Sequence, residues 1–323
     1  MSAVLYCVYT NGLFEELRRL NIGCCVGDNY VGVIGYADDL FLMAPSIDGL
    51  QKMLSVCERY ALSHNLTFST DCNPRKSKTK CIGFLLKDRE LPAMKLCGNH
   101  LPWVKEGKHL GMKIKNTLGM ILNSDIVEKR AQYIDRNNEL MQEFSFADRK
   151  TKTFINNVFN TSFYGSVLWD LQCKEAEMLY NTWSVSLRKI NMLERNTHRY
   201  FIEPISDTTH IKLALKKRFL NFTKKISTTK KCAARNIFNL IKYDCRSTTG
   251  KNLRSIMLEC GSMDVDSITS KDIATIDFYP VPPNEQWRIG LAIELLEARD
   301  EGNFPFGWNK DDINETIAYV CST

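Results

Sequence analysis

Apolar residues recur at helical spacing over residues 47–61, directly after a helix start signal at Pro45 and Ser46. This pattern predicts an amphipathic helix over residues 46–64. Just before it, two continuous apolar runs at residues 31–35 and 40–44 flank a short polar segment. Such runs predict two short buried strands, and the polar segment between them predicts the turn of a hairpin.

Further strand signals follow this helix. The runs at residues 79–86 and 94–104 read as strands, with a turn signal at Gly98-Asn99, and Gly107 and Gly111 bracket a third short run. From residue 123 onward the spacing becomes helical, with Asn123 or Ser124 as the expected cap. Helical patterns continue over residues 154–168, 176–193, 211–243 and 285–299.

These elements predict an α+β fold of three regions. Residues 1–118 should combine antiparallel hairpins with helices. Residues 119–205 should be helical, and residues 206–323 should form an extension of basic helices followed by an acidic tail. Trp103, Trp169 and Trp183 are expected in the core.

Composition narrows the class of protein. The chain has 323 residues, of which 44% are hydrophobic and 25% charged, as in an ordinary globular protein. It lacks an apolar run of about 18 residues and an N-terminal signal pattern, so we expect an intracellular protein of the nucleus or cytoplasm without a membrane partner. The 12 cysteines are scattered, which favours reduced thiols over disulfides. A metal site of Cys232, Cys245, Cys260 and His198 or His210 is an alternative.

Charge is distributed unevenly along the chain. The overall balance is +6, but residues 212–254 hold 13 Lys and Arg against one Asp, and residues 255–323 hold 13 Asp and Glu against four Lys and Arg. The basic stretch includes Lys224, Lys225, Lys230 and Lys231 and is interleaved with apolar residues. It therefore predicts amphipathic helices that attract a phosphate backbone. The alternative is a solvated helical face that pairs with the acidic tail.

Two adjacent carboxylates, Asp38 and Asp39, occupy the predicted hairpin turn after Tyr36 and Ala37. Ionised carboxylates between core strands are costly to desolvate unless a cation meets them. Mg²⁺ prefers oxygen ligands and is typically held by one or two carboxylates plus substrate phosphates. The segment therefore predicts a site for metal-dependent nucleotidyl transfer. An Asp pair in a solvated turn or at a helix cap is the alternative.

The residues around this pair resemble the C-terminal half of the reverse transcriptase of non-LTR retrotransposons. Residues 36–39 match the family's Tyr-Ala-Asp-Asp hairpin, and residues 2–17 resemble the palm helix that precedes it. Residues 73–78 are similar to its Asn-x-x-Lys-Ser element, and residues 108–111 to its primer grip, with His109 where an aromatic residue is usual. Residues 183–198 include segments that resemble the family's thumb region.

The resemblance implies RNA-templated DNA synthesis with Mg²⁺ or Mn²⁺. The partners would be an RNA template, a DNA primer and deoxynucleoside triphosphates. By resemblance, Asp38 is the principal metal ligand and Asp39 is secondary, while Tyr36 and Ala37 lie beside the primer terminus. Because side chains alternate along extended backbone, the two carboxylates should not be equivalent.

Two further roles follow from the same resemblance. Lys76 would lie near the incoming triphosphate, and the alternative is a solvated surface lysine. Lys108, His109 and Gly111 would support the primer strand, and the alternative is a plain strand edge.

In this family a further catalytic carboxylate and the fingers subdomain lie upstream of the palm helix. We therefore expect a truncated polymerase with little or no synthesis by this chain alone. Two alternatives stay open. One is a non-catalytic nucleic-acid-binding remnant that uses the basic helices of residues 212–254, and the other is a decayed reading frame with no present role.

Overall fold

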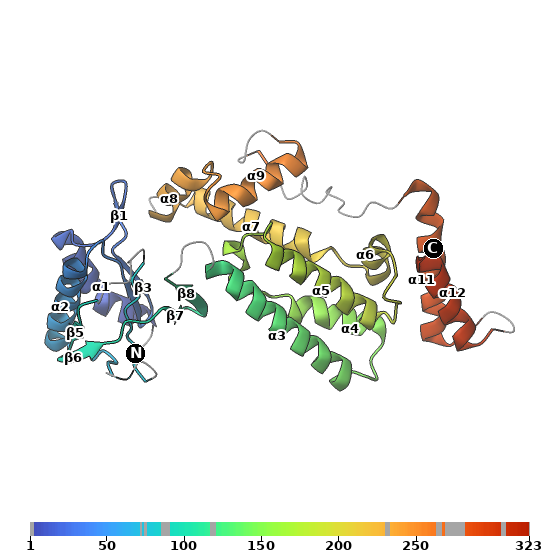
Figure 1. The fold of residues 1–323 in the computed structure, drawn as a ribbon, viewed down its shortest axis with the longest axis horizontal. Coiled ribbons are helices and arrows are strands. Elements are labelled where there is room, and N and C mark those ends of the chain that lie inside the picture. The colour runs from blue at the N-terminus through green and yellow to red at the C-terminus, as the bar shows by residue number, and fades with distance from the viewer. Residues whose placement is uncertain are drawn as a thin grey trace. The chain divides into compact units, whose positions relative to one another are not determined.

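The computed structural model describes residues 3–71, 73, 76–84, 91–116, 121–229, 233–262, 267–268, 282–304 and 308–322. The fold is mixed α+β, as the sequence predicted (Figure 1). The chain divides into two compact units. Unit 1 comprises residues 1–121 and 228–240, and unit 2 comprises residues 122–227 and 241–323.

Unit 1 contains two long helices and four hairpins among its described residues. The helices are α1 (Ala3–Leu20) and α2 (Ile47–Ser63). Unit 1 also includes most of α8 (Ala233–Ile241), which comes later in the sequence. The strands are β1 (Cys25–Val26), β2 (Asn29–Tyr30), β3 (Val33–Tyr36), β4 (Asp39–Leu42), β5 (Met94–Leu96), β6 (Asn99–Leu101), β7 (Glu106–His109) and β8 (Met112–Lys115). Each strand pairs antiparallel with its neighbour in sequence, giving four separate two-stranded sheets in the described part of the chain.

The core of unit 1 lies between α1 and α2, which run beside each other (Figure 1). Leu13 and Leu17 of α1 pack with Met53, Val56 and Cys57 of α2. Ser46 caps α2 by accepting a hydrogen bond from the backbone N–H of Gly49 at 3.1 Å. The helix predicted over residues 46–64 is therefore confirmed, and its apolar stripe is the face that it buries.

The strand predictions for unit 1 are partly right. The hairpin between residues 31 and 44 is confirmed, but its strands are exposed or only partly buried. The run at residues 79–84 forms only an isolated bridge between Cys81 and Trp103, and residues 85–90 lie outside the described residues. The third run does not end at Gly111, because Leu110 and Gly111 form a turn that leads into β8.

Helices are the regular secondary structure of unit 2 in its described residues. Its α-helices are α3 (Ile121–Glu143, all but its first residue), α4 (Arg149–Ile155), α5 (Lys174–Ile190), α6 (Ile202–Ser206), α7 (Ile211–Thr228, to residue 227), α9 (Thr248–Cys260), α11 (Gln286–Glu301) and α12 (Lys310–Ser322). Shorter turns are the π-helix η1 (Asn156–Asn160) and the 3₁₀-helices η2 (Ser166–Leu168), η3 (Arg199–Phe201) and η4 (Pro283–Glu285). Trp169 and Trp183 are buried, as predicted, and the Trp169 indole donates to Asp125 at 2.7 Å.

Three helix predictions for the second half need correction. The helix expected to begin after Asn123 or Ser124 already includes residue 121. The helical run over residues 154–168 is interrupted after Asn160, where Phe163 and Gly165 adopt positive φ. The run over residues 211–243 is divided into α7 and α8, and the sequence patterns did not single out α9 or α12.

The C-terminal helices α11 and α12 pack against η3 and α6. Their shared core includes Phe201, Ile205, Leu296, Ile313 and Cys321, all nearly inaccessible to solvent. Within this unit the C-terminal residues are thus part of the helical core.

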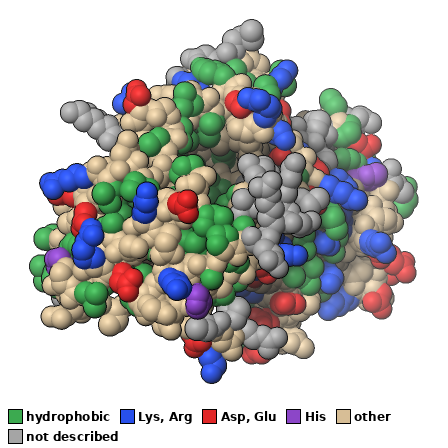
Figure 2. All heavy atoms as spheres, turned by 60° about the vertical axis from the view of Figure 1, so that its left-hand side comes forward, with side chains coloured by type: hydrophobic (Ala, Val, Ile, Leu, Met, Phe, Trp, Pro, Cys, Tyr) green, Lys and Arg blue, Asp and Glu red, His purple; other side chains and the backbone are tan. Residues whose placement is uncertain are grey.

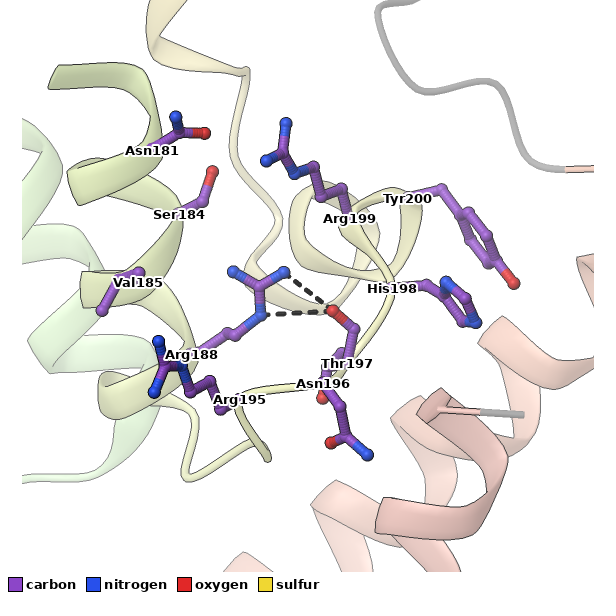
Figure 3. A pocket seen from close by; sticks show the side chains of 10 residues that line it. All are labelled: Asn181, Ser184, Val185, Arg188, Arg195, Asn196, Thr197, His198, Arg199 and Tyr200. Atoms are coloured by element: carbon purple, nitrogen blue, oxygen red, sulfur yellow. Dashed lines mark hydrogen bonds between the residues drawn. The ribbon is translucent and has the colours of Figure 1, made fainter. Parts of the chain in front are cut away.

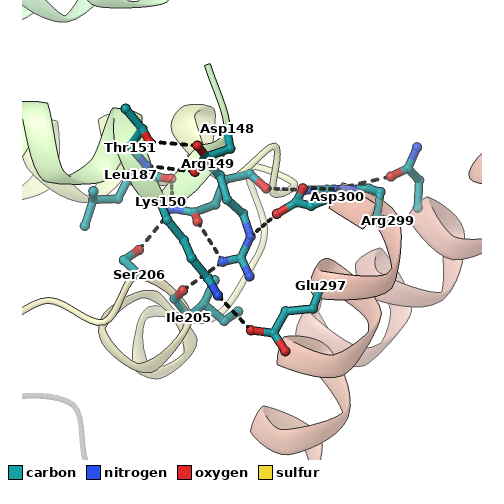
Figure 4. Close-up of polar contacts among 12 residues, drawn as sticks. Asp148, Arg149, Lys150, Thr151, Leu187, Ile205, Ser206, Glu297, Arg299 and Asp300 are labelled. Carbon is teal, nitrogen blue, oxygen red and sulfur yellow. Dashed lines mark hydrogen bonds and ion pairs between the residues drawn. The ribbon is translucent and has the colours of Figure 1, made fainter. Parts of the chain in front are cut away.

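A buried ionic network reinforces this packing (Figure 4). The Arg149 guanidinium donates from Nε to Asp300 of α11 at 2.5 Å and from Nη1 to the Ile205 carbonyl at 3.1 Å. Arg299 donates from Nη2 to the Asn191 carbonyl at 2.8 Å, and burial lowers the pKa of its guanidinium. Residues of α4, α5, α6 and α11 are therefore held in one polar cluster.

Among the described residues, no helix is both long and apolar enough to cross a membrane. No disulfide joins the cysteines among them.

Candidate functional site

The Tyr36–Asp39 segment forms a tight hairpin. Tyr36, the last residue of β3, pairs with Asp39, the first residue of β4, so Ala37 and Asp38 are the two turn residues. Ala37 has φ of +52°, a left-handed conformation that costs a residue with a Cβ about 1–2 kcal/mol. Asp38 lies in the turn and Asp39 in a strand, so the two carboxylates hold different positions.

The tip of this hairpin is open to solvent. Tyr36 is 66% exposed, and Ala37, Asp38 and Asp39 are also exposed. The expectation that core strands would desolvate the two carboxylates is therefore wrong, because a two-stranded sheet cannot cover its own turn. The negative charge of Asp38 does reach α1, where burial and then this charge raise the pKa of the Tyr6 phenol.

Helix α1 supports the hairpin from one face. Val33, Leu40 and Leu42 contribute side chains to the α1–α2 core. Gly35 lies so close to α1 that a Cβ at this position would be 2.4 Å from Cζ of Phe14. The backbone just before the turn is thus positioned by a close approach that only glycine allows without a shift.

The opposite face of the hairpin meets the β7–β8 hairpin. The rings of Phe41 and His109 lie 5.1 Å apart between centroids, at 31°. Phe41 follows Asp39 by two residues, so both side chains point to this same face. The structure therefore brings His109 next to the strand that carries Asp39.

Lys108 and Gly111 take different positions in the β7–β8 hairpin. Lys108 pairs with Lys113 and, by strand alternation, faces away from the side of His109. Two lysines directly opposite each other are unfavourable unless an anion lies near. Gly111 has φ of +79° and serves the turn.

Lys76 belongs to a closed loop. The Thr79 backbone N–H and hydroxyl both donate to the Ser69 carbonyl, at 3.3 and 2.9 Å, and close the base of this loop. Ser77 is buried, whereas Lys76 is exposed. Among the described residues, no ion pair joins Lys76 to Asp38 or Asp39.

The described residues contain no group of three His, Cys, Asp or Glu side chains that could hold a metal ion. Asp38 and Asp39 together supply two carboxylates. This donor set fits a hard cation, such as Mg²⁺ or Mn²⁺, that takes its remaining ligands from water and phosphate oxygens.

The basic residues of α7 divide into two groups. Lys216 is buried and contacts Glu259 at 2.5 Å, with a pKa lowered mainly by burial, and Arg218 donates to the Thr161 and Ser162 carbonyls at 2.7 and 3.0 Å. Lys217, Lys224 and Lys225 are exposed or partly exposed at positions that share one face of the helix. Lys230 and Lys231 lie outside the described residues.

Acidic residues of the C-terminal part form ion pairs with basic residues of two different helices. Glu259 meets the basic helix α7 at Lys216, whereas Glu297 and Asp300 pair with Lys150 and Arg149 of α4. On the face shown in Figure 2, basic and acidic side chains are interspersed over the described residues. Attraction of a polyanion would therefore depend on local clusters of cations.

One such cluster was not identified from the sequence. A cavity of about 700 Å³ in unit 2 is lined by Asn181, Ser184, Val185, Arg188, Arg195, Asn196, Thr197, His198, Arg199 and Tyr200 (Figure 3). Three of these residues are arginines, and none of the described lining residues is acidic. The sequence signal that could have indicated this cluster is the density of basic residues within residues 195–199.

No protein-family model matches the chain, and no curated protein matches it.

Proposed function

We propose that this chain is part of a metal-dependent nucleic-acid polymerase of the reverse transcriptase type found in non-LTR retrotransposons. The observation that carries the proposal is the hairpin with a two-residue turn that holds the consecutive residues Asp38 and Asp39 open to solvent. The contact between Phe41 and His109 supports it, because His109 belongs to the segment that resembles a primer grip.

In this proposal Asp38 and Asp39 hold Mg²⁺ or Mn²⁺. When bound, the metal would activate a primer 3′-hydroxyl and stabilise the charge of the leaving pyrophosphate. A rigid support improves such a site, and Phe14 against Gly35 on one face and His109 against Phe41 on the other supply it.

The other residues at the tip and nearby would bind nucleic acid and nucleotide. Tyr36, whose ring is exposed, would contact the primer terminus, and the small side chain of Ala37 would leave room for it. Lys76 would neutralise phosphate charge from its loop. The partners are an RNA template, a DNA primer and deoxynucleoside triphosphates.

Metal binding tests the proposal even where synthesis is weak. Mn²⁺ is titrated, and paramagnetic broadening of backbone NMR signals is recorded with an RNA–DNA primer–template and a deoxynucleoside triphosphate present. We expect broadening around residues 36–40 that is lost in Asp38→Asn and Asp39→Asn. Asp28→Asn is the matched control, because Asp28 is also an exposed hairpin-turn residue. Hairpin signals that stay sharp, or broadening unchanged in both variants, would contradict the proposal.

Primer extension on an RNA template gives a second readout. Any product should disappear in Asp38→Asn but not in Asp28→Asn. Synthesis that depends on Asp38 would support the polymerase proposal. Synthesis that persists in both hairpin variants would refute the assignment of the site.

A second candidate is a nucleic-acid-binding protein without catalysis. Three lysines on one face of α7 favour it: Lys225, which is exposed, and Lys217 and Lys224, which are partly exposed. The logarithm of the affinity for single-stranded RNA should then fall with the logarithm of the salt concentration by about 0.7 per phosphate contact. Charge reversal of Lys224, Lys225, Lys230 and Lys231 should reduce this slope. An unchanged slope would count against this candidate.

A further inference from the structure

Helix α12 has two different faces. Ile313, Ile317 and Val320 are buried in the core that α12 shares with α11, which lies beside it (Figure 1). Residues 312, 315, 316 and 319 recur at helical spacing and share the other face. An open cavity of about 580 Å³ lies along this outer face and is lined by Trp308, Asp312, Glu315, Thr316 and Tyr319. The cavity therefore belongs to unit 2 alone.

Two exposed aromatic residues line the cavity. Trp308 is 40% exposed and Tyr319 is 68% exposed. The backbone N–H of Asn309 donates to Oδ2 of Asp312 at 2.7 Å, and the backbone N–H of Asp312 donates to Oδ1 of Asn309 at 3.1 Å. This reciprocal cap fixes the chain next to Trp308 at the start of α12. Because the face of an aromatic ring carries partial negative charge, both rings can attract a cation.

The charge of the lining is negative. Asp312 and Glu315 bring two carboxylates, and the lining includes no Lys or Arg. Among the described residues, no basic side chain forms an ion pair with either carboxylate. Arg288, which donates to the Tyr319 carbonyl at the end of α12, is itself paired with Glu285 at 2.6 Å. Two like charges three residues apart on a helix repel each other until a cation lies near.

We propose that this cavity binds an organic ammonium group. The two carboxylates supply the opposite charge, and the rings of Trp308 and Tyr319 contact the nitrogen and its alkyl groups. A hard metal ion takes its ligands from oxygen atoms, so the rings would have no role for it. The combination of rings with carboxylates therefore favours an ammonium group over a metal ion. The proposal does not rest on the polymerase proposal, since Asp38 and Asp39 take no part in it.

Two sources carry this chemistry, a lysine side chain of a protein and a free quaternary amine. NMR titrations at physiological salt therefore compare tetramethylammonium with a short peptide that carries trimethyllysine and the same peptide with unmodified lysine. We expect shifts of the Trp308 indole N–H and of the backbone amides of residues 312–319. Similar affinities for all three probes identify a site for a free ammonium group, and binding of the peptides alone identifies a protein side chain. Ca²⁺ is the comparison cation.

Trp308→Leu/Tyr319→Leu removes both rings and tests their role. A cation–π contact at an exposed site changes the affinity by roughly two- to fivefold per ring, so we expect a loss of about fivefold or more. Trp287→Leu is the matched control, because Trp287 is an exposed tryptophan of α11 outside the lining. It should bind the probes as the unchanged protein does.

Asp312→Asn/Glu315→Gln removes both charges of the lining. The new amide can still accept from the Asn309 N–H, so the start of α12 is retained. We expect a loss of affinity of about threefold or more. Asp311→Asn/Glu301→Gln removes the same charge from exposed positions outside the lining and should have little effect, because salt screens distant charges.

The substituted residues are exposed or partly exposed, so the core between α11 and α12 is kept in every variant. The proposal is overturned if no ammonium probe binds the unchanged protein, or if Ca²⁺ alone shifts these signals. It is also overturned if the variant without the two rings binds the probes like the unchanged protein, since a plain acidic face would then explain the binding. Equal losses in a test variant and its control would overturn it as well.

Discussion

Replacement of Asp300 by Asn should loosen the attachment of α11 and α12 to the rest of unit 2. The Arg149 side chain is 4% exposed, and its Nε lies 2.5 Å from Oδ2 of Asp300. Asn keeps the size of Asp but removes the charge, so a buried guanidinium is left without its counter-ion.

The magnitude follows from the burial of the two partners. Removing one partner of a fully buried ion pair costs about 3–5 kcal/mol. Because the Asp300 side chain is 25% exposed, water can hydrate the altered site, and the cost should be nearer 2–3 kcal/mol. The carbonyl of Ile205, which also accepts from Arg149, keeps part of the network in place. For a unit of this size the melting temperature should fall by roughly 5–10 °C.

Thermal unfolding followed by circular dichroism measures the loss, and hydrogen exchange locates it. Exchange should accelerate over α11 and α12 more than over α3. Glu297→Gln on the same helix is the matched control, because Glu297 and Lys150 are 45% and 72% exposed and their pair should contribute nothing measurable. Arg149→Met/Asp300→Leu removes both charges of this pair and should recover part of the stability, because Arg299, whose Nε lies 4.0 Å from Asp300, still loses its counter-ion.

The reasoning is refuted if Asp300→Asn melts like the unchanged protein and its C-terminal helices exchange at the same rate. Equal losses in Asp300→Asn and Glu297→Gln would also refute it, because burial would then not set the strength of the pair.

Three other predictions concern the two units separately. Gly35→Ala places a Cβ 2.4 Å from Cζ of Phe14, so the free energy of unfolding, measured by thermal unfolding, should fall by about 1–3 kcal/mol. The additional substitution Phe14→Leu should partly restore it. An unchanged melting temperature would argue against this close approach. His109→Ala removes the ring contact with Phe41 and should lower the free energy of unfolding by about 0.5–1.5 kcal/mol. A double-mutant cycle with Phe41→Ala measures the contact, and additive effects of the two substitutions would contradict the prediction. Burial lowers the pKa of His210 from 6.5 to about 4, so the unfolded chain binds the proton first as pH falls. The free energy of unfolding should therefore drop by about 3 kcal/mol from pH 7 to pH 4, and His210→Gln should flatten this dependence in urea titrations.

Local patterns were sufficient to predict the helix α2 and the hairpin around Asp38 and Asp39. The apolar runs and the polar pair between them define the turn, because a two-residue connection needs no information from the rest of the chain. The left-handed conformation of Ala37 was not predictable, since alanine carries no signal for positive φ.

The sequence patterns could not predict contacts between segments that are far apart in the chain. Nothing in the spacing of residues 106–115 shows that His109 would meet Phe41, and the pairing of Arg149 with Asp300 spans half of the chain. The exposure of the hairpin tip was likewise missed, because an apolar run predicts a strand but not how many neighbours cover it. The arginine cavity combines α5 with a segment beyond its end, which only tertiary packing brings together.

The division into units has a consequence for synthesis on the ribosome. Each unit is discontinuous: unit 1 takes α8 from late in the chain, where Asn236 donates to Asn29 at 2.8 Å, and unit 2 is completed only by its C-terminal helices. Domains commonly fold in order as they emerge during translation. Here neither unit has all its residues until most of the chain has been synthesised, so unit 1 lacks α8 while residues 122–227 of unit 2 emerge. No single cut can release either unit whole.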